Sequence, residues 1–151
     1  MNDLNGYDFE DLSIGMTATF SKTITEADII LFAGASGDNN AIHINDEFAQ
    51  TTPFKGRIAH GFLTASTISA AIANRLPGPG TIYVSQNMRF VGPVRPGDTV
   101  HAEVTIKELV EDRKRAVLET ICRVGNTVVV KGEAVVKTTS KKIAVPDKRA
   151  T

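Results

Sequence analysis

The residues best able to move protons lie in one short segment, Asp38-Asn39-Asn40-Ala41-Ile42-His43. Asp38 and His43 are five positions apart in a predicted loop that follows a helix. A carboxylate and an imidazole can both transfer protons near neutral pH when their surroundings tune them. The same residue types are common where a helix ends in a turn, because an aspartate there bonds backbone N–H groups. On spacing alone, a turn without chemistry is the favoured interpretation.

A second candidate is the peptide N–H of Gly61, at the start of a predicted helix over residues 60–75. The first N–H groups of a helix have no internal partners and carry the positive end of its dipole. Because glycine has no Cβ to obstruct a ligand, this N–H could stabilise an oxyanion. Gly61 could equally serve close packing of the helix against a sheet. The sequence leaves both interpretations open.

Other polar residues have simpler expected roles. We expect His60 to bond local backbone, His101 to lie on a solvent-facing strand position, and Cys122 to be a small core residue. Ser69 lies inside the apolar helix, where a serine hydroxyl usually bonds back to the preceding turn. The sequence contains no metal-ligand spacing, phosphate-binding glycine loop or Gly-x-Ser-x-Gly motif. We therefore expect no metal site.

The elements that position these residues can be predicted from capping signals and periodicity. A strand is expected over residues 16–23, followed by a helix over 26–36 that begins after Thr25 and ends at Gly37. A loop over 38–44 and a short helix over 46–51 come next. The helix over 60–75 has no charge between Gly61 and Ala73, so it should be buried on most sides. The remaining strands are expected over 81–91, 99–109, 115–124 and 127–138.

Alternation along these elements predicts which side chains face the core. In the strand over 99–109, every second residue from Val100 to Ile106 is apolar, which indicates one buried face. The last two strands flank Gly125-Asn126, a hairpin signal. Core positions on the first helix and the last strand are expected at Ile29, Ile30, Phe32, Ala33, Val128, Val130, Ala134 and Val136.

One apolar helix followed by a meander of long antiparallel strands has a natural arrangement, in which the sheet curls around the helix. The predicted fold class is therefore α+β, a hot-dog fold with an antiparallel sheet wrapped around a central apolar helix. Residues 1–140 form one domain, and 141–151 form a basic, flexible tail. A single such sheet has exposed edges, so we expect a homodimer or a higher homo-oligomer.

The overall composition excludes several classes of partner. The 151 residues carry 17 basic and 17 acidic side chains, so net charge gives no field that would attract nucleic acid or a membrane surface. Cys122 is the only cysteine, which fits a reducing compartment. Residues 1–10 have neither the basic start nor the apolar stretch of a signal peptide, and no apolar run is long enough to span a bilayer. We expect a cytoplasmic protein.

Taken together, three stretches resemble the MaoC-like family, and specifically its short R-specific enoyl-CoA hydratases of the polyhydroxyalkanoate monomer-supplying type. They are the hydratase loop over 36–43, the Ile58-Ala59-His60-Gly61 segment, and the stretch over 80–98 with Tyr83, Phe90 and Pro93-Val94-Arg95-Pro96-Gly97-Asp98. The resemblance covers residues 12–137. Two positions depart from the family pattern: Ala41 replaces its usual proline, and Asn45 replaces its usual aspartate. Both affect support of the loop more than proton transfer.

The resemblance implies roles for individual residues. Asp38 and His43 would be the catalytic pair, and Asn40 would order the loop between them. The N–H of Gly61 would bind the thioester carbonyl, and Ser69 would lie near the acyl pocket. Together they imply reversible hydration of trans-2-enoyl-CoA to (R)-3-hydroxyacyl-CoA. No cofactor is implied, since coenzyme A is part of the substrate.

The CoA phosphates need cationic partners, and two alternatives to a hydratase stay open. The candidate cations are Lys55, Arg57, Arg89 and Arg95, each of which could also be a solvated surface charge. The first alternative is a hot-dog acyl-CoA thioesterase, in which a carboxylate activates water against the carbonyl carbon. The second is a non-catalytic acyl-CoA-binding subunit. The presence of both Asp38 and His43 argues against the second alternative.

Overall fold

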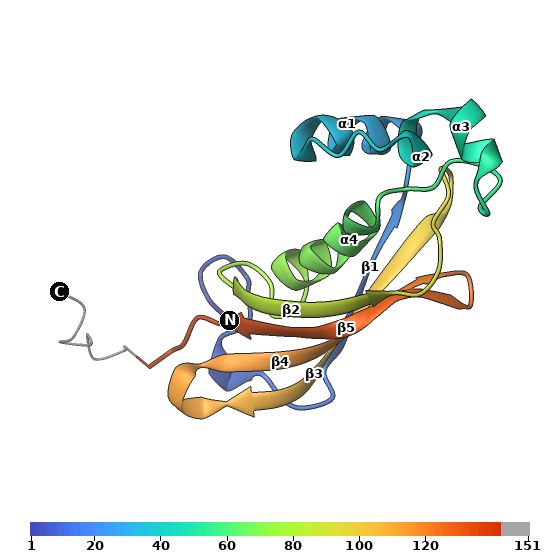
Figure 1. Cartoon of the computed structure of the whole chain (residues 1–151). Coiled ribbons are helices and arrows are strands. Elements are labelled where there is room, and N and C mark those ends of the chain that lie inside the picture. The colour runs from blue at the N-terminus through green and yellow to red at the C-terminus, as the bar shows by residue number, and fades with distance from the viewer. Residues whose placement is uncertain (143–151) are drawn as a thin grey trace.

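The computed structural model describes residues 1–142, which form an antiparallel sheet curved around one long helix, α4 (Gly61–Asn74) (Figure 1). The five strands stand in the order β1-β3-β4-β5-β2. Their bounds are β1 (Thr17–Thr23), β2 (Ile82–Phe90), β3 (Thr99–Val110), β4 (Arg115–Val124) and β5 (Thr127–Lys137). Two 3₁₀ turns, η1 (Phe9–Asp11) and η2 (Glu111–Arg113), precede β1 and join β3 to β4. The predicted α+β hot-dog fold is confirmed.

The order of the strands differs from the expected meander. Only β3, β4 and β5 follow one another, whereas β2 pairs with β5 at one edge and β1 pairs with β3 at the other. Pro93 and Pro96 lie between β2 and β3, and a proline has no N–H with which to continue a strand ladder. This segment instead passes beside the start of α4, where the Ala59 N–H donates to the Val94 carbonyl at 2.7 Å.

The core lies between α4 and the concave face of the sheet. The predicted buried face of β3, from Val100 to Ile106, is confirmed. On β5 the prediction was wrong at Val128, which is only half-buried, while Val129 and Val130 are both buried. The cause is a bulge, because the register between β4 and β5 shifts at Cys122 and gives β5 one extra residue there.

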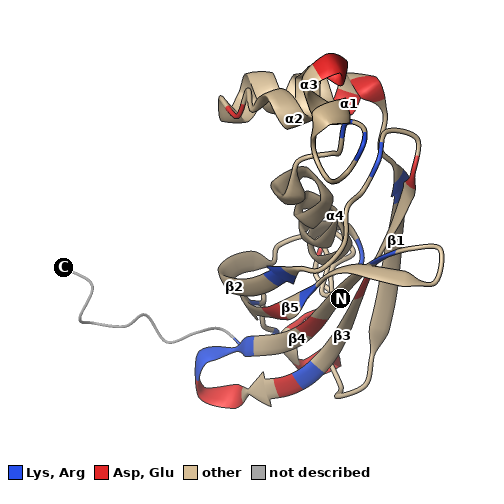
Figure 2. Ribbon diagram, turned by 45° about the vertical axis from the view of Figure 1, so that its right-hand side comes forward, with Lys and Arg blue, Asp and Glu red and all other residues tan. Residues whose placement is uncertain are grey.

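Helix α4 is exposed along one stripe only. Leu63, Ile68 and Ile72 pack into the core, but Phe62 is 65% exposed, and Ser66 and Ser69 are exposed as well. The prediction of burial on most sides is therefore confirmed, and the exception is this one stripe, which the single chain leaves uncovered. The uncovered stripe is uncharged, and Figure 2 shows no charged residue on α4.

Three short helices, α1 (Glu26–Ser36), α2 (Ala41–Ile44) and α3 (Asp46–Thr51), lie together near the N-terminal end of α4 (Figure 1). The predicted ends of α1 are confirmed: Thr25 and Asp28 form a capping box, and Gly37 has a φ of 79°. Ile29 and Ala33 are buried as expected, but Ile30 is exposed, because α1 covers the domain with one face only.

The expected loop over 38–44 ends in a helical turn. The Asn40 side chain accepts a hydrogen bond from the Ile42 N–H, and this cap starts α2. Asn45 caps α3 in the same way by accepting from the Phe48 N–H at 2.9 Å, as predicted.

The two ends of the described chain lie side by side. The Glu10 carboxylate accepts from the Ser140 hydroxyl at 2.6 Å and from the Lys141 N–H at 2.9 Å, and the Lys141 ammonium bonds Asp11. Lys141 belongs to the segment expected to be a flexible tail, and residues 143–151 lie outside the described part of the chain. Within residues 1–142, no helix combines the length and apolar character needed to cross a membrane.

Candidate active site

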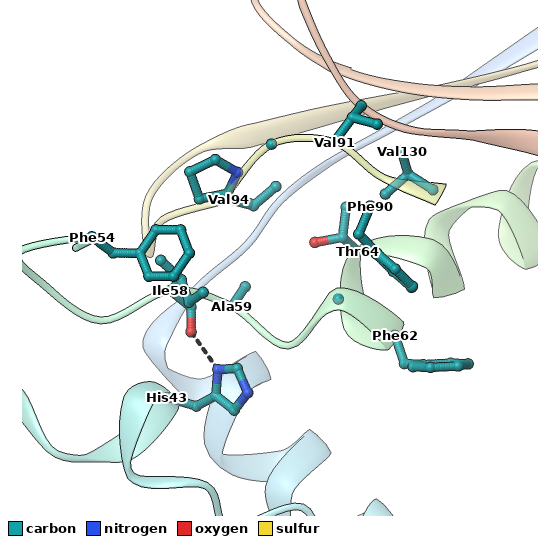
Figure 3. A pocket seen from close by; sticks show the side chains of 13 residues that line it. His43, Phe54, Ile58, Ala59, Phe62, Thr64, Phe90, Val91, Val94 and Val130 are labelled. Atoms are coloured by element: carbon teal, nitrogen blue, oxygen red, sulfur yellow. Dashed lines mark hydrogen bonds between the residues drawn. The ribbon is translucent and has the colours of Figure 1, made fainter. Parts of the chain in front are cut away.

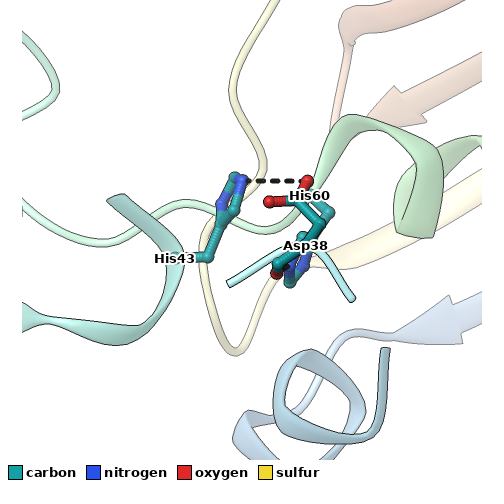
Figure 4. Close-up of side chains that lie close together, drawn as sticks. All are labelled: Asp38, His43 and His60. Atoms are coloured by element: carbon teal, nitrogen blue, oxygen red, sulfur yellow. Dashed lines mark hydrogen bonds and ion pairs between the residues drawn. The ribbon is translucent and has the colours of Figure 1, made fainter. Parts of the chain in front are cut away.

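The structure brings Asp38 and His43 together. Asp38 Oδ2 lies 4.0 Å from His43 Nε2 (Figure 4). The Asp38 side chain is 49% exposed, whereas the His43 side chain is only 10% exposed. A carboxylate that water can reach therefore faces an imidazole held in the protein.

The loop between the two residues is ordered by its own side chains. Asp38 Oδ1 accepts from the Asn40 N–H, and Asn40 Oδ1 accepts from the Ile42 N–H, both at 3.2 Å. The Asp38 N–H in turn donates to the Ser36 hydroxyl at 3.1 Å. These consecutive turns shape the loop around Ala41, where the family resemblance leads one to expect proline.

The tautomer of His43 follows from its hydrogen bond. His43 Nδ1 lies 2.8 Å from the Ile58 carbonyl oxygen. A carbonyl can only accept, so Nδ1 carries the proton and Nε2 presents a lone pair in the neutral ring. This lone pair is on the side of the ring that faces Asp38.

The sequence led us to expect that His60 bonds local backbone, and this prediction was wrong. Its Nε2 donates to the backbone carbonyl of Asp38, 22 residues away, at 2.9 Å. Its ring stacks on the ring of His43, with centroids 3.9 Å apart, and also contacts Phe32. Among the described residues, the buried His60 Nδ1 has no hydrogen-bond partner. The burial of His60 beneath the loop has no local signal in the sequence.

A cavity of about 530 Å³ begins at His43 and at the first turn of α4 (Figure 3). Within the described chain, the Gly61 N–H has no hydrogen-bond acceptor. A Cβ at Gly61 would lie 2.7 Å from Phe90 Cε1, so only glycine fits here without moving the ring. The cavity wall is largely apolar and includes Phe54, Ile58, Phe62, Phe90, Val94 and Val130.

Sequence analysis missed several side chains of this cavity, among them Thr64 and Phe54, and one predicted residue lies elsewhere. Thr64 lines the cavity one turn after Gly61, and Phe54 lies in a segment that showed no regular pattern. Ser69 lines a different groove of about 260 Å³, beside Tyr83 on the exposed side of α4. The single chain therefore does not place Ser69 in the large cavity.

The four candidate cations differ in their surroundings. The Arg57 guanidinium contacts both Glu26 oxygens at 2.7 Å and Asp46 at 2.5 Å. Its hydrogen bonds to Glu26 hold the pKa of that carboxyl below its usual value. Arg89 lies opposite Lys131 in the ladder between β2 and β5, and both line a groove separate from the cavity. Arg95 donates to the Phe54 carbonyl at 2.6 Å, so it and Lys55 lie beside Phe54, which lines the cavity.

Asp38, His43 and His60 place possible metal-ligand atoms within 4.8 Å of one another. The two imidazole rings are stacked with only 30° between their planes. Lone pairs lie in the ring plane, so those of two nearly parallel rings lie in nearly parallel planes, whereas metal ligands must converge on one point. The arrangement does not suit a metal ion.

Comparison with known proteins agrees with this geometry. The MaoC like domain matches residues 11–146. An (R)-specific enoyl-CoA hydratase of Rhodospirillum rubrum is 53% identical over 135 residues, covering 89% of this chain and 94% of that protein. A 3-hydroxybutyryl-CoA dehydratase of Methylorubrum extorquens is 49% identical, covering 91% and 88%. The (R)-hydratase from Aeromonas caviae involved in polyhydroxyalkanoate biosynthesis superposes with a TM-score of 0.83 at 42% identity, covering 85% and 98%. The chain belongs to the MaoC-like family.

Proposed function

We propose that this protein is an R-specific enoyl-CoA hydratase, which adds water reversibly to trans-2-enoyl-CoA to give (R)-3-hydroxyacyl-CoA. One observation carries the proposal: the Asp38 carboxylate faces His43 Nε2 beside an apolar cavity that begins at the free N–H of Gly61. The relatives named (R)-specific enoyl-CoA hydratase and 3-hydroxybutyryl-CoA dehydratase support it, as does their coverage of nearly the whole chain.

In the proposed reaction, the thioester carbonyl accepts a hydrogen bond from the Gly61 N–H. This bond polarises the conjugated double bond and stabilises the enolate that forms when C3 is attacked. The donor is fixed at the tip of α4, so no reorganisation is needed when charge develops on the oxygen.

One water molecule is held between the carboxylate of Asp38 and Nε2 of His43. Asp38 takes a proton from this water as its oxygen bonds to C3, and the electron pair of the double bond moves into the enolate. The enolate then collapses as C2 accepts a proton, and Asp38 gives up the proton that it took, so the elements of one water are added and the carboxylate is restored. His43 orients the water and assists delivery of the C2 proton.

The acyl chain lies along the apolar wall formed by Phe90, Val94 and Val130. The CoA phosphates extend past the mouth, where Lys55 and Arg95 are the better placed cations. Arg57 is already paired with two carboxylates, and Arg89 lies across the sheet. No cofactor beyond the CoA of the substrate takes part.

The function is tested with crotonyl-CoA by following two signals. Hydration removes the enoyl absorbance without releasing thiol, whereas a thioesterase releases free CoA. Cys122 is buried and burial raises the pKa of its thiol, so a thiol reagent reports CoA with little background from the protein.

The product is then offered to R-specific and S-specific 3-hydroxyacyl-CoA dehydrogenases. Thiol release, an S product, or no turnover with measurable binding would each contradict the proposal, the last in favour of a non-catalytic acyl-CoA-binding subunit.

We also infer a homodimer that works in the cytoplasm. The free edge of β2 exposes Ile82 and Val84, and the uncovered stripe of α4 exposes Phe62. A second copy that covers both would remove an open sheet edge and an apolar surface together. The compartment is inferred from the single cysteine, which needs no oxidising surroundings.

A further inference from the structure

We propose that His60 is a positioning residue for the hydration reaction. It would fix the positions of the Asp38 loop and the His43 ring relative to the Gly61 N–H. This inference rests on the proposed function and adds a residue to it, because His60 belongs to none of the groups that contact water or substrate in the reaction above.

The first support is the bond from His60 Nε2 to the Asp38 carbonyl at 2.9 Å. The other hydrogen bonds of Asp38 are made within its own loop, to Ser36 and Asn40. Among the described residues, the His60 side chain is thus the one that joins the Asp38 loop to the start of α4 by a hydrogen bond. Without it, the carboxylate would be placed only by a surface turn.

The second support is the stacking of the two rings. The His60 ring lies 3.9 Å from the ring of His43 and 4.9 Å from the ring of Phe32. His43 is otherwise fixed through its bond to the Ile58 carbonyl, about which the ring can still tilt. Contact with the face of His60 limits this tilt and fixes the direction of the His43 Nε2 lone pair.

The third support is the place of His60 in the chain. It is the N-cap of α4, so its own peptide leads directly into Gly61. One residue therefore connects the carboxylate, the imidazole and the carbonyl-binding N–H. Errors of about 1 Å in such an arrangement can cost roughly 100-fold in rate.

His60 is 1% exposed and does not line the cavity, so it does not reach the substrate. Its Nδ1 is buried without a partner in the described chain, which proteins usually avoid. An apolar residue would remove that unbonded atom but would also remove the bond to Asp38. The residue type is therefore explained by positioning better than by packing.

Three substitutions separate the two contacts. His60→Gln keeps an N–H donor near the position of Nε2 but loses the ring, His60→Phe keeps the ring but loses the donor, and His60→Ala loses both. His101→Gln is the matched control, because His101 is exposed and bonds Ser21 on the outer face of the sheet. For each full-length variant, kcat and KM for crotonyl-CoA, the folded fraction and the pH profile of kcat/KM are measured.

The expected result is that His60→Ala lowers kcat by ~100-fold per folded molecule, while KM stays within about threefold. His60→Gln and His60→Phe each recover part of this loss, and both limbs of the pH profile keep their midpoints. A kcat within twofold of wild type in His60→Ala would overturn the inference, as would loss of one limb, because His60 would then exchange a proton itself.

If His60→Ala does not fold, the other two variants decide. A reduction of kcat by at least threefold in both, with KM retained, supports positioning; wild-type kcat in both overturns it. A wild-type protein that does not hydrate crotonyl-CoA overturns the proposed function and this inference together. An active wild type with insensitive His60 variants overturns the inference alone.

Discussion

The imidazole rings of His43 and His60 stack 3.9 Å apart but donate hydrogen bonds from different nitrogens. His43 donates through Nδ1 to the Ile58 carbonyl, and His60 donates through Nε2 to the Asp38 carbonyl. In their neutral forms, the two adjacent rings are thus opposite tautomers, each selected by one backbone oxygen. This leaves Nε2 as the nitrogen of His43 that faces the Asp38 carboxylate.

Nitrogen NMR can test this pair directly, since the chain has only three histidines. Long-range proton–nitrogen spectra of histidine-labelled protein at pH 8 should show one ring protonated at Nδ1 and another at Nε2. The signals are assigned with His60→Gln and His101→Gln. If His43 were protonated at Nε2, this nitrogen could not accept the hydrogen bond by which it is proposed to orient the water.

Asp38→Asn should lower kcat by at least ~100-fold, because an amide cannot take the proton from water. The fold should be unaffected, since Asp38 is half exposed and its main-chain bonds remain available. Steady-state hydration of crotonyl-CoA and thermal unfolding check both parts. Asp112→Asn, at an exposed position in η2, is the control and should match the wild type. Wild-type rates in Asp38→Asn would remove the carboxylate from the mechanism.

Gly61→Ala should impair carbonyl binding by displacing Phe90. The added Cβ would lie 2.7 and 2.8 Å from two atoms of that ring, so we expect overpacking of about 1–3 kcal/mol. We also expect kcat/KM to fall by roughly 10- to 100-fold. The double variant with Phe90→Leu should recover stability, which chemical denaturation measures.

The control for this change is Gly34→Ala on α1. Nothing lies within 4 Å of a Cβ at that glycine, so it should be neutral or stabilising. Full activity in Gly61→Ala would contradict the assigned role of its N–H.

The contacts between the two chain ends should weaken in acid. The Ser140 hydroxyl, followed by the Lys141 N–H, lowers the pKa of Glu10 from 4.5 to about 2. A lowered folded-state pKa stabilises the fold above about 4.5, and this stabilisation is lost as the pH falls through about 2. The melting temperature of Glu10→Gln should therefore lie below that of the wild type at pH 7, and the gap should close towards pH 2. A gap that is constant with pH would rule out the charge as its cause.

The open edge of β2 predicts how assembly responds to charge. The wild type should have twice the 16.2 kDa mass of one chain by light scattering. Ile82→Lys, at a residue that is 63% exposed, should shift the protein towards the monomer by placing a charge in the interface. Ile14→Lys, at 68% exposure outside this surface, is the control and should leave the mass unchanged. A monomeric wild type would contradict the inferred homodimer.

Features governed by near neighbours in sequence could be predicted. The ends of α1 and the start of α3 follow from Thr25, Gly37 and Asn45, whose caps act within three or four residues. The buried face of β3 follows from strict alternation. The proximity of Asp38 and His43 also follows from one short segment, since only five positions separate them.

Features governed by tertiary contact could not be predicted. The partner of His60 is a backbone oxygen 22 positions away, and an acceptor of that kind is present in every residue. The pairing of β2 with β5 depends on a long connection rather than a hairpin turn. The bulge that turns Val129 inward arises from how β4 and β5 align, and Val128, Val129 and Val130 are identical in type.

Two parts of the chain that are distant in sequence line the cavity. Residues 90–94, which end β2 and leave the sheet, form much of the cavity wall, whereas the proposed reacting groups lie in the loop before α2, on α2 and at the tip of α4. Substitutions at Val91 or Pro93 can therefore change the length or branching of the acid that fits while leaving the reacting groups in place. Substrate range and catalytic power can thus be varied separately in this enzyme.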